Sequence, residues 1–313
     1  MQKYGFGIDI GGTTIKMGLF EMSGELLEKW EIPTRTEESG AYILDDIADQ
    51  VDQKLKEKGI SKEEVKGIGM GVPGPVREDG TVIKCVNLGW GVFNVEQALA
   101  EKTGLFVKAG NDANVAALGE MWRGSGEGSE DVLLVTIGTG VGGGIVTGGK
   151  MLAGSNGAAG EIGHIKVNFE WEEECSCGKS GCLEQFVSAR GFARVTEKIL
   201  KEDLTCETSL RTIESVTAKD IFDAAKQGDD FAVKRVEDFG EMLGTAIANI
   251  ACVLNPQVIV IGGGVSKAGN IVTDVLTKYF MKNSYHASRN AKIVLAKLGN
   301  DAGIYGCICM IAE

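Results

Sequence analysis

The segment GFGIDIGGTTIKMGLF (residues 5–20) combines an apolar stretch, a tight Gly/Thr turn and a returning apolar stretch. LLVTIGTGVGGGIVTGG (133–149) follows the same plan. Both segments predict two strands joined by a glycine-rich turn. Because glycine lets the backbone come close to a ligand, two such hairpins can hold a polyphosphate between their N–H groups. The pair therefore favours a phosphate-binding protein.

A third glycine turn, IGGGV (261–265), follows another predicted strand and strengthens this interpretation. Glycine-rich hairpins are common, so each one alone could be a purely structural turn. None of the three contains the P-loop pattern GxxxxGK[ST], and no GxGxxG opens a helix after a strand. The sequence thus predicts neither a P-loop nor a dinucleotide-binding fingerprint.

Strand and helix signals alternate along the rest of the chain, which is typical of an α/β protein with mixed or parallel sheets. The predicted strands are 3–10, 15–20, 65–72, 105–109, 132–137, 258–261 and 292–296. The predicted helices are 43 to about 59, 94 to about 103, 112–122, 231–254, one ending near 280, and a last one from about 298.

Composition narrows the class of protein. The 313 residues suffice for two domains, and 43% hydrophobic with 24% charged residues excludes wholesale disorder. A net charge of −12 argues against nucleic acid or an anionic membrane as the main partner. No apolar run approaches the roughly 18 residues that span a bilayer, and no secretory signal is found. We therefore expect a cytoplasmic protein with reduced thiols.

Three of the eight cysteines cluster in CSCGKSGC (175–182), with His164 upstream. Cys175, Cys177, Cys182 and His164 could supply four ligands for a tetrahedral Zn²⁺, and a closed four-ligand set indicates a structural metal. Unpaired buried thiols are the alternative. The other cysteines are predicted to lie in the core: Cys85, Cys206, Cys252, Cys307 and Cys309.

Four carboxylates are candidates for chemistry. Glu161 and Glu184 flank the cysteine cluster, so a bound zinc would fix them where vicinal hydroxyls could donate to them, although solvated surface glutamates would also fit. Asp112 follows a predicted strand and opens a helix. It could be a general base for phosphoryl transfer or the helix N-cap. Asp9, within the first hairpin, could hold Mg²⁺ through water.

Eight short motifs are distributed over nearly the whole chain. They are GIDIGGTT (7–14), GVPGPV (71–76), NLGW (87–90), NDAN (111–114), IGTGVGGGIV (137–146), GAAGEIGH (157–164), CSCGKSGCLEQ (175–185) and LNPQVIVIGGGVS (254–266). With these motifs the chain resembles the ROK family (repressors, open reading frames and kinases) of the actin-like, ribonuclease H-like ATPase superfamily, and its bacterial glucokinases in particular.

This resemblance implies an α/β fold of two actin-like domains with an interdomain cleft. The small domain would comprise 1–111 plus 298–313, and the large domain 112–297 with a zinc-binding segment at 164–182. It also implies ATP-dependent phosphorylation of a hexose, most readily glucose at O6, at the entry to glycolysis.

The resemblance also assigns roles, position by position. The catalytic base would be Asp112. Sugar contacts would be Gly74, Asn87, Asn111, Asp112, Glu161, His164 and Glu184. ATP, with Mg²⁺, would lie against Asp9, Gly11, Gly12, Thr13, Thr14, Thr139, Gly140, Gly263 and Gly264. Structural Zn²⁺ would be held by His164, Cys175, Cys177 and Cys182, and a homo-oligomer, dimer or tetramer, is expected.

Other functions remain open at this point. A kinase for fructose, allose, mannose or an N-acetylated amino sugar would share these motifs. A sugar-responsive repressor would need a helix-turn-helix segment ahead of them, whereas the first glycine hairpin begins at residue 5. An actin-like filament or chaperone ATPase would need neither the sugar residues nor the cysteine cluster.

Overall fold

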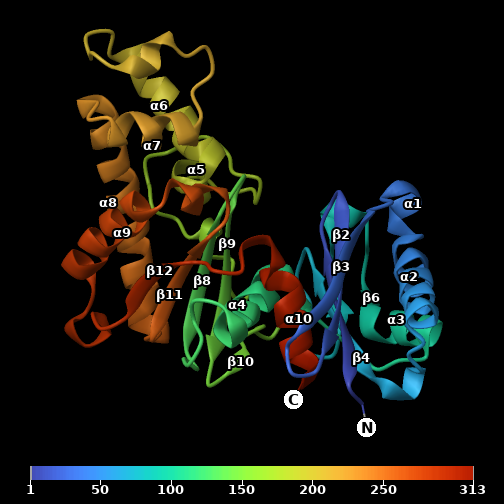
Figure 1. Ribbon diagram of the computed structural model, residues 1–313. Helices are drawn as coiled ribbons and strands as arrows, with labels where there is room; N and C mark the ends of the chain where they lie inside the picture. Colours follow the sequence, from blue (N-terminus) through green and yellow to red (C-terminus); the bar gives the residue numbers. More distant parts are fainter. Residues whose placement is uncertain (1, 313) are drawn as a thin grey trace. The chain divides into compact units, whose positions relative to one another are not determined.

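The structure, a computed structural model, describes residues 2–312 and divides into two compact units (Figure 1). Unit 1 comprises the residues up to 130, residues 144–160 and those from 297 onward; unit 2 comprises 131–143 and 161–296. Residues 112–130 thus group with unit 1, although the family resemblance begins the large domain at residue 112. The functional domain boundary at residue 111 stays a prediction.

Unit 1 is built on a five-stranded sheet with strand order β3-β2-β1-β4-β7. Its strands are β1 (Tyr4–Ile10), β2 (Thr14–Glu21), β3 (Leu26–Pro33), β4 (Val65–Val72) and β7 (Val107–Asn111). β1 runs antiparallel to β2 and parallel to β4, which is parallel to β7. The carboxyl ends of β1, β4 and β7 therefore lie at one edge of the sheet, where ligands gather in α/β folds.

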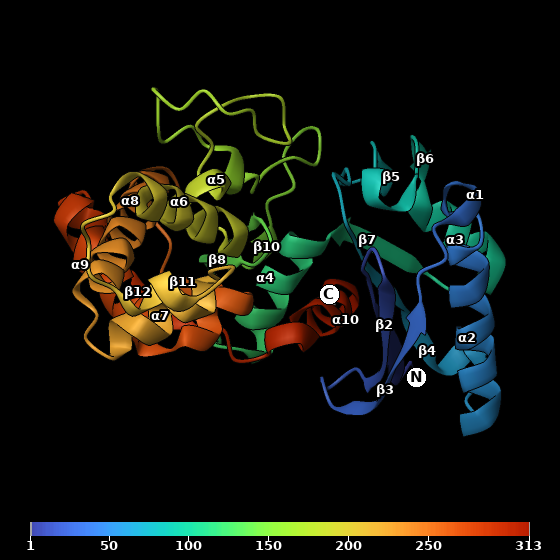
Figure 2. The same cartoon turned by 90° about the horizontal axis from the view of Figure 1, so that it is seen from above.

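Helices cover both faces of this sheet (Figure 2), with α2 and α3 on one face and α4 and α10 on the other. The helices of unit 1 are α1 (Glu37–Gly40), α2 (Ile43–Lys58), α3 (Val95–Thr103), α4 (Asp112–Arg123) and α10 (Ala302–Ala312). A small hairpin, β5 (Thr81–Val82) with β6 (Phe93–Asn94), and the 3₁₀ turns η1 (Lys62–Glu64), η2 (Val86–Leu88) and η7 (Gly299–Asp301) complete the unit.

Glycines let α10 lie directly on the backbone of its neighbours. A Cβ added at Gly69 in β4 would come 1.9 Å from the Cys307 carbonyl oxygen, and one at Gly306 would come 1.7 Å from that of Val115 in α4. The chain leading to α10 is tied to α4 as well, because the buried Glu120 carboxylate accepts hydrogen bonds from the Lys297 and Leu298 amides at 3.2 and 2.8 Å. No larger residue could replace either glycine without moving the helix.

The second sheet has strand order β10-β9-β8-β11-β12. Its strands are β8 (Val132–Ile137), β9 (Val141–Thr147), β10 (Lys150–Met151), β11 (Val258–Gly262) and β12 (Lys292–Leu295). The unit boundary passes through β9, so β10 counts with unit 1. β11 pairs in parallel with both β8 and β12.

The helices of unit 2 pack together through aromatic side chains. They are α5 (Glu184–Val187), α6 (Ala189–Glu202), α7 (Ala218–Lys226), α8 (Asp230–Leu254) and α9 (Asn270–Asn283), with 3₁₀ turns η3 (Ile162–His164), η4 (Ser209–Thr212), η5 (Gly264–Ala268) and η6 (His286–Ser288). Phe192, Phe222 and Phe239 join α6, α7 and α8, with ring centroids 5.1–5.5 Å apart.

Cys85, Cys307 and Cys309 are buried, as predicted. The prediction is wrong for Cys252, which lies on the exposed side of α8, and for Cys206, which lies half-buried in the loop after α6. Among residues 2–312 no helix is both long enough and apolar enough to cross a membrane.

Candidate functional site

Asn111 and Asp112 lie where β7 passes into α4. The Asn111 side chain is the N-cap, because its Oδ1 accepts from the amides of Ala113 and Asn114 at 3.1 and 3.2 Å. Asp112 is the first helical residue, and its Oδ1 accepts from Asn111 Nδ2 at 3.0 Å and from the Ala113 amide at 2.8 Å. Asn111 therefore performs the capping that was one of the two roles open to Asp112.

Asn111 also connects this corner to Gly74, a predicted sugar contact, by donating from Nδ2 to the Gly74 carbonyl at 3.2 Å. Gly74 has φ +147°, and a Cβ there would meet the Lys84 carbonyl at 2.9 Å. Beside it lies Cys85, whose Sγ donates to the Pro73 carbonyl. Burial, aided by the nearby charge of Asp112, raises the pKa of the Cys85 thiol. The thiol was predicted only as a core residue, yet it lies at the edge of the site.

Asp9, on β1, lies across from Gly71 on β4. A Cβ at Gly71 would lie 3.4 Å from Asp9 Oδ1 and 3.6 Å from Asp112 Cα, so the two aspartates flank one glycine. Burial raises the pKa of Asp9, an effect that the charge of Lys16 partly opposes. A carboxylate in this position fits Mg²⁺, which binds proteins through one or two carboxylates together with substrate phosphates and water.

The β1–β2 turn carries Gly11, Gly12, Thr13 and Thr14. It is closed by a hydrogen bond of 3.0 Å from the Gly11 amide to the Thr14 carbonyl. A Cβ at Gly12 would lie 3.8 Å from Asn87 Cβ, so a predicted sugar contact lies beside the predicted phosphate turn. In unit 1 the structure therefore brings together all of the predicted base, sugar and phosphate residues of that unit.

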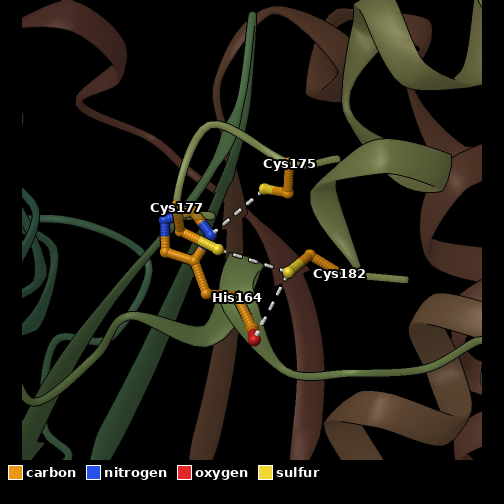
Figure 3. A group of neighbouring side chains, drawn as sticks. All are labelled: His164, Cys175, Cys177 and Cys182. Atoms are coloured by element: carbon orange, nitrogen blue, oxygen red, sulfur yellow. Dashed lines mark hydrogen bonds between the residues drawn. The ribbon is translucent and has the colours of Figure 1, made fainter. Parts of the chain in front are cut away.

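In unit 2, His164, Cys175, Cys177 and Cys182 point toward one another (Figure 3). Their ligand atoms all lie within 4.8 Å of each other, with Cys175 Sγ 3.7 Å from His164 Nδ1 and Cys177 Sγ 3.6 Å from Cys182 Sγ. Tetrahedral Zn²⁺ with Zn–S bonds of about 2.3 Å separates its ligands by roughly 3.5–3.8 Å. The donor set and its spacing fit zinc. Burial, followed by hydrogen bonds with Cys177 and Cys175, raises the pKa of Cys182 to about 12.

Two glutamates approach this cluster from opposite sides of the imidazole. Glu184 Oε1 lies 3.8 Å from His164 Nδ1 and accepts from Cys175 Sγ at 3.3 Å and Ser176 Oγ at 3.2 Å. Glu161 is exposed, and its Oε2 lies 3.9 Å from His164 Nε2. His164 Nδ1 therefore faces Cys175, and Nε2 faces the Glu161 carboxylate.

The second phosphate turn is adjacent to this cluster. A Cβ at Gly140 would come 2.8 Å from Glu184 Oε2, and one at Gly263, where φ is +82°, would come 2.5 Å from the Ile137 carbonyl. A cavity of about 520 Å³ in unit 2 is lined by Thr139, Gly140, Cys175 and Glu184. Of the predicted ATP residues, Thr139 and Gly140 thus lie beside the His/Cys cluster, and Gly263 and Gly264 follow β11, the strand that pairs with β8.

The structure adds residues that the sequence analysis did not single out. Asn114 is buried, donates from Nδ2 to the Ala159 carbonyl at 3.4 Å and accepts at Oδ1 from the Ile145 amide at 3.0 Å. It therefore holds α4 to the second half of β9. Arg190 and Arg194 line the 520 Å³ cavity. Asn114 belongs to the quoted NDAN motif, but its tertiary contacts lie too far along the chain to be read from spacing.

Comparisons with known proteins match almost the entire chain to one family. The family model described as "ROK family" matches residues 5–313. The chain is 47% identical over 306 residues to a glucokinase of Halalkalibacterium halodurans, covering 96% of this chain and 92% of that one. It is 32% identical to a xylose repressor of Caldicellulosiruptor bescii, covering 97% of this chain and 77% of the repressor.

A solved structure extends the likeness to three dimensions. It is that of a ROK family glucokinase from Streptomyces griseus in complex with glucose and AMPPNP, with a TM-score of 0.74 and 32% identity over 97% of each chain.

Proposed function

Since the chain belongs to the ROK family, with the actin-like fold of its sugar kinases, we propose that it is a glucokinase that transfers the γ-phosphate of ATP to O6 of glucose. The 47% identity to a glucokinase over 96% of the chain supports this activity. So does the likeness to a glucokinase whose structure contains glucose and AMPPNP.

The observation that carries the proposed mechanism is the division of roles at the start of α4. Asn111 is the N-cap, while Asp112, the first helical residue, accepts at Oδ1 from Asn111 and from the Ala113 amide. We assign Asp112 the role of general base: it accepts the proton of the glucose O6 hydroxyl as that oxygen attacks the γ-phosphorus of ATP. Asn111 Nδ2, 3.0 Å from Asp112 Oδ1, holds the carboxylate in position.

The phosphates would be held mainly by backbone donors of the two turns at Gly11–Thr14 and Thr139–Gly140. Asp9 would hold Mg²⁺, which when bound neutralises charge on the transferring phosphate. The four-ligand zinc cluster would be structural, because it leaves no open coordination position. By fixing η3 and the segment 175–182, it would position Glu161, His164 and Glu184 for the sugar.

Glucose selection is assigned to Glu161 and Glu184. A carboxylate can accept hydrogen bonds from two adjacent equatorial hydroxyls, and a sugar with one of them inverted or acylated leaves it unmatched. An acceptor that the bound sugar covers but leaves unmatched costs about 1–3 kcal/mol, and 1.4 kcal/mol corresponds to a factor of ten in rate. We therefore expect kcat/KM for glucose to exceed that for fructose, galactose or N-acetylglucosamine at least about tenfold.

A coupled ADP-release assay across a panel of hexoses tests this assignment. Glu161→Gln should narrow the gap between glucose and the other sugars more than it changes the KM for ATP. Glu172→Gln, at an exposed position of the nearby acidic run, is the matched control and should leave the gap unchanged. A panel in which N-acetylglucosamine outruns glucose would overturn the glucose assignment and leave a hexose kinase; no activity on any sugar would overturn the kinase.

The same hexose assay also tests the repressor alternative. A sugar-responsive regulator would bind DNA and phosphorylate nothing, so activity in the panel excludes that as its function. The homo-oligomer, the cytoplasmic location and the supply of glucose 6-phosphate to glycolysis belong to this proposal as expectations.

A further inference from the structure

Asp9 and Gly303 come from opposite ends of the chain and are in direct contact. Gly303 is the second residue of α10, and a Cβ added there would lie 2.6 Å from both Cγ and Oδ2 of Asp9. The other carboxylate oxygen, Oδ1, faces Gly71 of β4, where an added Cβ would lie at 3.4 Å. The Asp9 carboxylate therefore lies between two glycines, one on each side.

The helix that carries Gly303 is held against the strand that carries Asp9. One turn further along α10, the buried Cys307 donates from Sγ to the carbonyl of Ile8, the residue before Asp9, at 3.2 Å. A Cβ at Gly7 would come 2.3 Å from the Ile304 carbonyl, so β1 and α10 touch backbone to backbone. The position of Gly303 relative to Asp9 is thus fixed by contacts of α10 with Gly7 and Ile8, which precede Asp9 in β1.

We propose that Gly303 is a positioning residue for the Mg²⁺-binding carboxylate: its missing side chain sets where the Asp9 carboxylate points, and the last helix thereby takes part in nucleotide binding. This inference rests on the proposed function through the assignment of Mg²⁺ to Asp9. The carboxylate is a hard oxygen donor that burial and the nearby charge of Lys16 both affect, and it packs against Gly71 on one side and Gly303 on the other.

We expect different consequences when Gly303 and Gly306 of α10 are each replaced by alanine. At Gly303 the nearest atoms all belong to the Asp9 side chain: Cγ and Oδ2 at 2.6 Å and Cβ at 3.1 Å. The carboxylate can rotate away and Cβ has to move by only a few tenths of an ångström, so the protein should fold with the carboxylate displaced. At Gly306 the obstacle is the backbone of Val115 and Gly119 in α4, which cannot rotate away. Gly303→Ala should therefore affect metal and nucleotide, whereas Gly306→Ala should affect stability.

The test measures binding of Mg²⁺·AMPPNP by calorimetry, together with glucose binding, melting temperature and kcat. Gly303→Ala should weaken the Mg²⁺-dependent part of AMPPNP binding at least about fivefold and lower kcat about tenfold or more, because small misplacements of a reacting group cost large factors. Its glucose affinity and melting temperature should match the wild type. Gly306→Ala, the control, should lower the melting temperature first.

A double-variant cycle with Asp9→Asn decides whether Gly303 acts through Asp9. In the Asp9→Asn background, Gly303→Ala should change Mg²⁺·AMPPNP binding by less than about twofold, since the carboxylate it displaces is absent. Additive effects, unchanged Mg²⁺ dependence, or a parallel loss of glucose binding and stability in Gly303→Ala would each overturn the inference. A wild-type protein that binds AMPPNP with no dependence on Mg²⁺ would overturn the Mg²⁺ assignment as well.

Discussion

Neighbouring residues with similar side chains perform separate tasks at the start of α4. Asn111 accepts the hydrogen bonds of two helix amides, and Asp112 is held by Asn111 beside Gly71. An amide suits the cap because it also donates, to the Gly74 carbonyl and to Asp112. A carboxylate suits the position that, in the proposed mechanism, would accept a proton. Exchanging the two residues would leave an oxygen for the cap at position 111 but would put an amide, which cannot take up a proton, at position 112.

Asp112→Asn separates these tasks. It should lower kcat by about 10²–10⁴-fold, because a positioned general base contributes about that factor. Glucose binding and melting temperature should stay close to the wild type. A coupled ADP-release assay at saturating glucose and ATP measures kcat, and isothermal titration calorimetry measures glucose binding.

Asn111→Ala is the contrasting variant, since loss of an N-cap costs about 1 kcal/mol of stability. If Asp112→Asn kept more than about a tenth of the wild-type kcat, the base would have to be another group.

Among whole elements, the start of α8 shows how a single carboxylate can secure a long helix. Asp229 is the N-cap: Oδ1 accepts from the Ala232 amide at 3.0 Å, and Oδ2 accepts from the Ser209 amide, Ser209 Oγ and Thr208 Oγ1, each at 2.8 Å. Partial burial would raise the pKa of Asp229, but these hydrogen bonds outweigh it and lower the pKa. The same group thereby joins η4 to α8.

Asp229→Ala should destabilise the protein by about 1–2 kcal/mol at neutral pH. Because the pKa is lowered in the folded state, this contribution is complete above the unfolded pKa of about 3.9 and is lost as the pH falls through the folded value. The difference in melting temperature from the wild type should therefore be constant from pH 7 to 5 and shrink toward pH 3. Asp230→Ala, at the exposed next position, should change little at any pH; an equal loss in both variants would contradict the capping role.

Elements were predictable where the local pattern was strong. The bounds of β4 and β8 were predicted correctly, because both are short, mostly buried segments without charged residues beyond Lys66. β3 was not predicted, although its alternating LLEKWEIP is typical of a half-buried strand, and neither were α6 and α7. The strand predicted at 105–109 lies at Val107–Asn111, since its register is set by pairing with β4.

At the scale of the whole molecule, the grouping of His164 with Cys175, Cys177 and Cys182 was predictable because four residues of scarce types lie close together in the sequence. The contact of Asp9 with Gly303 was not, because the two residues meet only when the last helix packs on the first strand. The roles of the sugar and ATP residues came from motif resemblance, and the structure adds that each unit gathers its own share of them. Residues that are close in the sequence can be grouped from the sequence alone, whereas contacts between distant segments require the packed structure.

Metal removal tests the largest consequence of the cluster. Metal analysis should return about one zinc per chain, and Cys177→Ser should lose zinc, melting temperature and glucose affinity together, because metal binding contributes directly to folding. Cys252→Ser, at an exposed position on α8, is the control and should keep all three. A zinc-free protein with wild-type activity and melting temperature would refute the structural role of the metal.

The packing of α10 also has a consequence for biosynthesis. The ribosome makes β1, β4 and α4 early, but residues 161–296 must follow before α10 emerges. At about 5–20 residues per second this delay lasts roughly 7–27 seconds. During that time the surfaces of β4 and α4 on which α10 packs, at Gly69 and Gly119, are not covered by that helix. We expect unit 1 to finish folding only after translation, and holdase chaperones to bind nascent chains from which α10 has not yet emerged.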